Sequence, residues 1–233
     1  MLLLVAVSAV TLLTLRPPAP EPIDAPAGTF SAARAMVTVT AIAGQPRPLG
    51  SPAGDAVRDL LVGRLRAQGL DARVTTSVGA NAFGGEATVG RVENIIATLP
   101  GTDPTGAVVL AAHYDSVAAG PGAADDGAGV AAIVETVRTL RTQAPLRNDL
   151  VVLLTDGEEP GLLGAQAFVR DDPLRARPVV VLNWEARGVV ARRERAAPRL
   201  VDARPRHGTE RDRPRPVRAP LAPHHNLHAV SGY

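Results

Sequence analysis

The chain has 233 residues, enough for one sizeable core and a small second unit. It contains no cysteine, which excludes disulfides and thiolate metal ligands, and all of its 25 basic side chains are arginine. The net charge of +2 conceals an asymmetry: residues 191–233 hold ten arginines against four acidic residues, whereas residues 1–190 carry a net charge of −4. The basic character therefore belongs to the tail and does not indicate a nucleic-acid-binding protein.

The chain opens on about fifteen almost wholly apolar residues, closed by Arg16 and a Pro-rich stretch. The segment is short for a membrane-spanning helix, which needs roughly 20 apolar residues, and it lacks the basic start of a typical signal peptide. Its apolar character nevertheless favours one of these two roles. We interpret residues 1–16 as a signal peptide or a membrane anchor, with the rest of the chain outside the cytoplasm. A buried helix of a soluble core is the alternative, and the Pro-rich linker at 17–29 disfavours it.

The next hundred residues combine helical and extended patterns. Apolar residues recur at helical spacing in 30–43 and 53–68, and the second helix stops at Gly69. Residues 70–78 and 90–99 are predicted to be strands separated by a Gly-rich turn, GANAFGG.

From residue 107 onward, apolar strands alternate with helices. The predicted order is strand 107–113, helix 127–143, strand 149–155, helix 161–172 and strand 178–184. Such alternation implies parallel strands joined by crossover helices. We therefore expect an α/β protein, a three-layer α/β/α domain over residues 30–188 with a mixed, mainly parallel sheet.

Each of these three strands ends in acidic or metal-binding side chains. His113 and Asp115 follow the first strand, Glu158 and Glu159 the second, and Glu185 the third. Ligands of open α/β sheets bind at the carboxyl ends of the strands. One histidine and several carboxylates, without cysteine, suit a divalent cation such as zinc.

Simpler structural explanations exist for several of these residues. His113-x-Asp115 places both side chains on one face, where Asp115 can hold a ring nitrogen, although a structural histidine fits the same pattern. Asp125 and Asp126 lie at a predicted helix start, where capping is the ordinary role. We leave capping open for Asp126 and favour Asp125 as a ligand that bridges two cations.

The Glu158-Glu159 pair is the most informative feature. Adjacent carboxylates repel each other, but a metal ligand beside a general base would give each its own function. Acidic residues at a helix start are the alternative. Glu185 could pair with Arg187 on the surface, but its place after a buried strand favours the site.

Four segments in this order, AHYDS, GPGAADDGAG, DGEEPGLLGAQAF and LNWEARG, resemble zinc-dependent aminopeptidases of the M28 family. The last segment is similar to the branch of endoplasmic-reticulum and vacuolar membrane metallopeptidases. The resemblance covers about residues 30–190. It implies hydrolysis of peptides with a free N-terminus by a water that zinc activates.

The resemblance also implies roles for individual residues. His113 and Glu185 would bind one zinc, Glu159 the second, and Asp125 would bridge the two. Asp115 would orient His113, and Glu158 would be the general base. The peptide bond between Asp125 and Asp126 is expected to be cis.

One part of the family pattern is missing. The second zinc of the family takes a further histidine downstream, and this chain offers only His207, His224, His225 and His228, in an Arg/Pro-rich context. We assign none of them. The ligand set for one zinc is complete and that for the other is not, so we expect nearer one zinc than two. A catalytically incomplete, non-enzymatic and membrane-tethered relic of the fold is the alternative.

Residues 189–233 show neither helical nor strand periodicity and contain six prolines. We expect them not to be a native continuation of the domain, because a GC-rich gene read out of frame yields such a composition. A genuine disordered basic tail is the alternative. The tail lacks aromatic residues for base stacking until Tyr233, so no nucleic-acid partner is expected. A serine hydrolase built on Ser116 is excluded, because no G-x-S-x-G motif is present.

Overall fold

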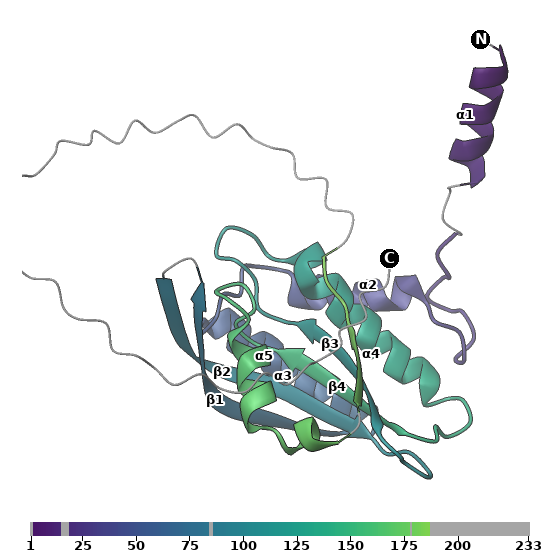
Figure 1. Ribbon diagram of the computed structural model, residues 1–233. Helices are drawn as coiled ribbons and strands as arrows, with labels where there is room; N and C mark the ends of the chain where they lie inside the picture. Colours follow the sequence, from purple (N-terminus) through teal and green to yellow (C-terminus); the bar gives the residue numbers. More distant parts are fainter. Residues whose placement is uncertain (1, 15–18, 84–85, 178, 187–233) are drawn as a thin grey trace, which may run out of the picture.

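The structure is a computed structural model that describes residues 2–14, 19–83, 86–177 and 179–186. Its five helices lie in chain order as in Figure 1: α1 (Leu2–Thr14), α2 (Ala32–Ile42), α3 (Pro52–Ala67), α4 (Ala128–Leu140) and α5 (Leu163–Asp171). A turn at Ala123–Gly127 precedes α4, and a short 3-10 helix, Pro173–Ala176, follows α5. The five strands are β1 (Asp71–Phe83), β2 (Glu86–Leu99), β3 (Ala107–His113), β4 (Asp149–Thr155) and β5 (Val179–Asn183).

The strands form one mixed sheet in the order β1-β2-β4-β3-β5. β4, β3 and β5 are mutually parallel, whereas β1 pairs antiparallel with β2, and β2 antiparallel with β4. The expected mixed α/β sheet is confirmed. Its parallel part consists of β4, β3 and the edge strand β5. Their carboxyl ends consequently meet at one edge of the sheet.

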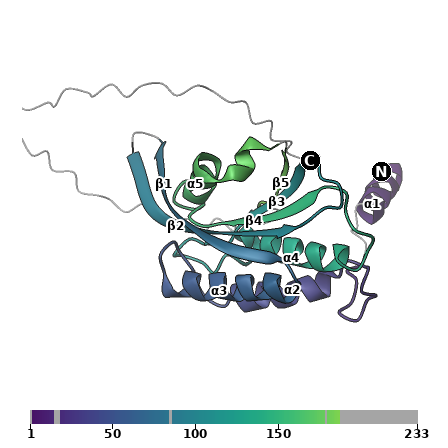
Figure 2. The same cartoon turned by 90° about the horizontal axis from the view of Figure 1, so that it is seen from below.

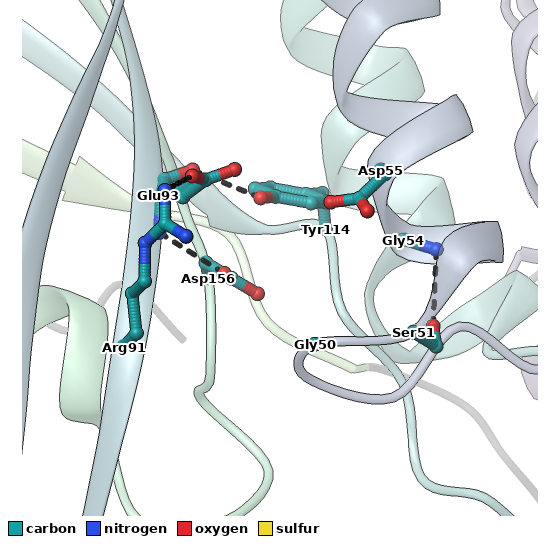
Figure 3. A pocket seen from close by; sticks show the side chains of 8 residues that line it. All are labelled: Gly50, Ser51, Gly54, Asp55, Arg91, Glu93, Tyr114 and Asp156. Carbon is teal, nitrogen blue, oxygen red and sulfur yellow. Dashed lines mark hydrogen bonds and ion pairs between the residues drawn. The ribbon is translucent and has the colours of Figure 1, made fainter.

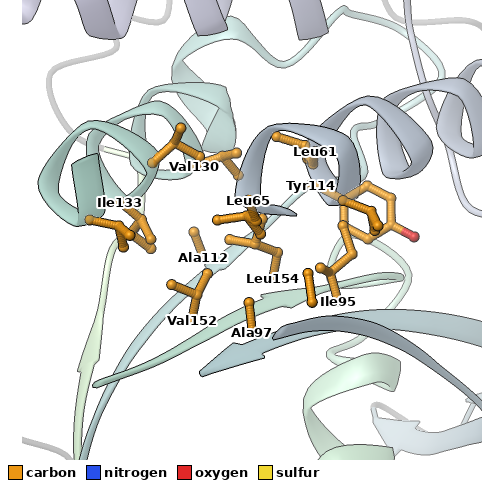
Figure 4. Packing of buried hydrophobic residues seen from close by; sticks show 14 of the residues in the cluster. Leu61, Leu65, Ile95, Ala97, Ala112, Tyr114, Val130, Ile133, Val152 and Leu154 are labelled. Carbon is orange, nitrogen blue, oxygen red and sulfur yellow. The ribbon is translucent and has the colours of Figure 1, made fainter. Parts of the chain in front are cut away.

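Helices cover both faces of the sheet. α2, α3 and α4 lie on one face and α5 on the other, which gives the expected three layers (Figure 2). The larger core lies under α3 and α4, where Leu65, Ile133 and Leu154 are buried together (Figure 4). A smaller core of Val109 and Val151 packs against Phe168 of α5. β3 and β4 are thus buried on both faces, which explains their nearly continuous apolar sequences.

The Gly-rich turn predicted at 79–85 is too long, although two antiparallel strands do flank it. β1 continues to Phe83 and β2 begins at Glu86, so most of this stretch is strand. Gly79 and Gly90 pair across the hairpin, and Leu163 of α5 lies against both. A Cβ atom at Gly79 would lie 2.4 Å from the Leu163 carbonyl oxygen. These glycines therefore serve close packing of α5 on the hairpin and not a turn.

The end of the expected Pro-rich linker is tied to the domain. The Arg34 guanidinium donates hydrogen bonds to the carbonyls of Ile23, Ala25 and Thr29. α1 covers most of the apolar opening segment, and none of the helices described is long and apolar enough to cross a membrane. The expectations for residues 189–233, including their histidines, fall outside the described residues.

Candidate metal centre

The predicted site residues lie at the shared carboxyl edge of β3, β4 and β5. His113 is the last residue of β3, and the amide of Tyr114 still donates to the Thr155 carbonyl of β4 at 2.9 Å. On the other side, the Trp184 amide donates to the Ala111 carbonyl at 2.8 Å, which fixes the chain just before Glu185. Strand pairing therefore sets where these side chains leave the sheet.

Three side chains from separate segments converge there. His113 Nε2 lies 3.0 Å from Asp125 Oδ1 and 3.8 Å from Glu185 Oε1. One candidate ligand atom from each of these three residues lies within 4.8 Å of the other two. Ligands about 2 Å from a tetrahedral zinc lie roughly 3.3 Å apart, so the three could close on one ion with small movements.

Asp115 connects the histidine to the loop that follows β4. One of its carboxylate oxygens lies 3.3 Å from His113 Nδ1. The same carboxylate accepts hydrogen bonds from the backbone amides of Glu158, at 3.0 Å, and Glu159, at 3.2 Å. Only 1% of Asp115 is exposed. The contact with His113 was expected from the spacing, whereas the two amide contacts depend on strand order and had no signal in the sequence.

The two aspartates have different surroundings. The peptide bond between Asp125 and Asp126 is cis, as the resemblance implied. Asp126 is buried and accepts a hydrogen bond from the Gly129 amide at 3.1 Å, so it caps α4. Burial raises the pKa of Asp126 to about 7. Asp125 instead directs its carboxylate to His113.

The two glutamates also separate. Glu158 Oε2 lies 3.9 Å from His113 Nε2, and burial, followed by the negative charge of Glu185, raises the pKa of Glu158. Glu159 accepts a hydrogen bond from the Val117 amide at 3.1 Å and is not among the three residues that converge. Burial and the nearby Asp125 raise the pKa of Glu159.

The electrostatics of the cluster favour a cation. Burial alone would lower the pKa of His113, but the Asp115 carboxylate at 3.3 Å from Nδ1 and the other carboxylates around the ring outweigh it and raise this pKa to about 9. Negative charge thus concentrates around a single imidazole. A divalent cation relieves that repulsion, and one imidazole with carboxylates fits zinc among the common ions.

A pocket of about 170 Å³ lies between the start of α3 and β2 (Figure 3), and none of the three converging residues lines it. Tyr114 and Asp156 line it together with Glu93 of β2, and the Tyr114 hydroxyl donates to the Glu93 carbonyl at 2.9 Å. This pocket could not be predicted from the sequence, because its walls come from segments far apart in the chain. Arg47, likewise unforeseen, is fully buried in the turn between α2 and α3.

Comparisons with known proteins agree with this architecture. A zinc-dependent exopeptidase from Parabacteroides distasonis has the same fold, with a TM-score of 0.59 at 21% identity over 69% of this chain and 63% of that one. A glutaminyl cyclase from Porphyromonas gingivalis has a TM-score of 0.58 at 27% identity over 67% of this chain and 59% of that one. The fold is therefore that of the zinc aminopeptidase-like α/β proteins.

The family follows from the sequence. A profile of peptidase family M28 matches residues 94–209, which extends past residue 188, where we expected the domain to end. A vacuolar membrane protease of Pyrenophora teres f. teres is 32% identical over 195 residues, covering 73% of this chain and 20% of that protein. The chain belongs to peptidase family M28. It spans only 8–20% of the length of the curated relatives described as vacuolar membrane proteases.

Proposed function

We propose that the protein is a zinc-dependent metallopeptidase of the aminopeptidase type, which hydrolyses the first peptide bond of a peptide with a free N-terminus. The observation that carries the proposal is the convergence of His113, Asp125 and Glu185 at the strand edge, with Glu158 at its rim. Membership of family M28 supports the same chemistry.

The residues present fit zinc, and each has a distinct task. His113, Asp125 and Glu185 would hold one ion, and Glu159 beside Asp125 would serve a second. Zinc at such a site polarises the scissile carbonyl and acidifies the attacking water.

Two further residues transfer the proton and orient the histidine. Glu158 takes the proton of the attacking water and returns it to the leaving amine, and burial raises its pKa, which makes the carboxylate a stronger base. Asp115 keeps Nδ1 of His113 occupied so that Nε2 faces the ion. The acidic surroundings attract the ammonium group of a free N-terminus.

The proposed location is a membrane-anchored or secreted one, with the peptidase domain outside the cytoplasm. The names of the curated relatives support membrane association, and the apolar residues 1–16 would provide the anchor or export signal. Among the residues that the structure describes, none supplies a further histidine for a second zinc. We therefore expect nearer one zinc than two per chain and weak activity, and a non-enzymatic relic is the alternative.

Purified variants test the division of roles through zinc content and turnover of a leucine anilide. Glu158→Gln should lower turnover by roughly 10²–10⁴-fold and leave zinc content unchanged, because a general base is not a ligand. His113→Ala and Glu159→Gln should lose zinc. Asp103→Asn, in an exposed ion pair with Arg147, is the matched control and should change neither quantity.

Equal zinc loss in all three site variants would contradict the assigned roles. Robust turnover with two zincs per chain would contradict the expectation of an incomplete site. A peptide with N-terminal glutamine separates hydrolysis from the cyclisation suggested by the glutaminyl cyclase neighbour. The protease relatives favour release of free glutamine, whereas release of ammonia would favour cyclisation.

A further inference from the structure

Arg47 is a fully buried arginine that lacks the usual counter-ion. It lies in the turn between α2 and α3, and 0% of its surface is exposed to solvent. Within the described residues, no carboxylate comes within ion-pair distance of its guanidinium. A buried cation requires compensation, so the groups that accept its hydrogen bonds define its role.

Backbone groups of a single loop, residues 114–122, provide that compensation. The guanidinium donates hydrogen bonds to the carbonyls of Tyr114, Pro121 and Gly122, the last at 3.0 Å. The Arg47 amide donates to the Ser116 hydroxyl at 2.9 Å, and the Arg47 carbonyl accepts from the Ser116 amide at 3.3 Å. One residue thus holds both ends and the middle of the loop.

This loop joins the two halves of the candidate metal centre. It begins directly after His113, contains Asp115 and ends three residues before Asp125. At its end, Gly122 has a φ of 57°, and its carbonyl also accepts the amide of Gly127 at the start of α4. The position of Asp125 relative to His113 therefore depends on the conformation that Arg47 holds.

The charge of Arg47 also interacts with the acidic residues of the site. Burial lowers the pKa of its guanidinium, and the negative charges of Asp115, Asp126 and Glu159 oppose that shift. The side chain is thus a buried positive charge close to carboxylates of the site. Its positive charge offsets part of the mutual repulsion of these carboxylates.

We propose that Arg47 is a positioning residue of the metal centre, which braces the loop 114–122 so that His113 and Asp125 face one ion. The inference rests on the proposed zinc site. It assigns to Arg47 no contact with substrate or with the metal.

Zinc affinity, measured by competition with a fluorescent chelator on the full chain, tests the inference. Arg47→Ala should weaken zinc binding by about 10–100-fold, as is typical when support behind a ligand is lost. The zinc affinity of Arg47→Lys should lie between that of the wild type and that of Arg47→Ala. Lysine keeps the positive charge, but its ammonium group cannot reproduce the planar hydrogen-bonding geometry of the guanidinium. Guanidinium ion at low millimolar concentration should restore part of the affinity of Arg47→Ala.

Arg34→Ala is the control, because Arg34 likewise donates to three backbone carbonyls, those of Ile23, Ala25 and Thr29, but makes no contact with the loop 114–122. Arg34 differs in that its Nε also pairs with Glu135 at 3.0 Å. Arg34→Ala should lower the urea midpoint but leave zinc affinity within about twofold of the wild type, since distant sites act independently. Guanidinium should not change its zinc affinity.

Wild-type affinity in folded Arg47→Ala, or rescue of its urea midpoint without rescue of zinc affinity, would overturn the inference. Should Arg47→Ala not fold, Arg47→Lys and Ser116→Ala decide: weaker zinc binding in both supports the brace, and unchanged binding in both overturns it. Should the wild type bind no zinc, the proposed function fails by itself. Amide exchange in residues 114–122 then tests the brace, which predicts faster exchange in Arg47→Lys than in Arg34→Ala, and equal exchange overturns it.

Discussion

Asp156 is a carboxyl group whose surroundings oppose its charge. Only 7% of the residue is exposed, and one oxygen accepts a hydrogen bond from the Glu93 amide at 3.0 Å. Burial raises the pKa of Asp156 to about 6. In the unfolded chain the pKa is near 3.9, so the folded state binds an extra proton between about pH 4 and pH 6. This group therefore stabilises the fold less as pH rises through that window.

Asp156→Asn should remove that dependence. We compare the unfolding free energy of the variant with that of the wild type at pH 4 and at pH 7. From the lower to the higher pH, this difference should shift in favour of the variant by roughly 2–3 kcal/mol, since one pKa unit corresponds to about 1.4 kcal/mol. Urea denaturation of both proteins at the two pH values measures it. An equal difference at both pH values would show that the carboxyl titrates normally in the folded state.

At the residue scale, the sequence predicted the acidic edge but not its supports. The alternation of apolar strands with acidic ends indicated His113, Glu158 and Glu185, because parallel strands bring such ends together. Arg47 and the two amide contacts of Asp115 escaped prediction. Their partners are backbone groups of distant segments, and a lone arginine between two prolines has no pattern that indicates burial.

The elements themselves show why local patterns succeed or fail. β3 and β4 have the predicted bounds, because long apolar runs between turns identify buried strands. The β1–β2 hairpin was predicted too short, because its glycines suggested a turn. Gly79 and Gly90 instead allow α5, which comes about 80 residues later in the sequence, to pack closely on the strands.

Gly164 tests how tightly α5 is docked. A Cβ atom there would lie 2.2 Å from the Asp156 carbonyl oxygen and 2.4 Å from Asn94 Oδ1. Asn94 also donates to the Gly164 carbonyl at 2.8 Å, so the neighbours are held in place. Gly164→Ala should therefore destabilise the protein by about 1–3 kcal/mol in urea unfolding, the usual cost of overpacking.

Gly63 in α3 is the matched control. A Cβ atom there meets nothing within 4 Å. Gly63→Ala should stabilise the protein by roughly 0.5–1 kcal/mol, because alanine is the better helix former. Equal effects of the two substitutions would contradict the close docking of α5.

At the scale of the whole molecule, the sheet topology brings the separate sequence motifs together at the candidate metal centre. The order β4-β3-β5 places three strand ends side by side, and the loop 114–122 brings Asp125 over them. The three-layer fold and this convergence follow from the alternating pattern. Zinc occupancy, the role of residues beyond 186 and the nature of the peptide substrate depend on chemistry that no periodicity encodes.

Anomalous diffraction at the zinc edge, from crystals of the full chain soaked in zinc, tests the central claim most directly. We expect a strong peak roughly 2.0–2.2 Å from His113 Nε2 and from carboxylate oxygens of Asp125 and Glu185. A peak of lower height beside Glu159 would mark a partly filled second position. Zinc bound elsewhere on the chain, with no peak between these three side chains, would contradict the metal centre proposed for this protein.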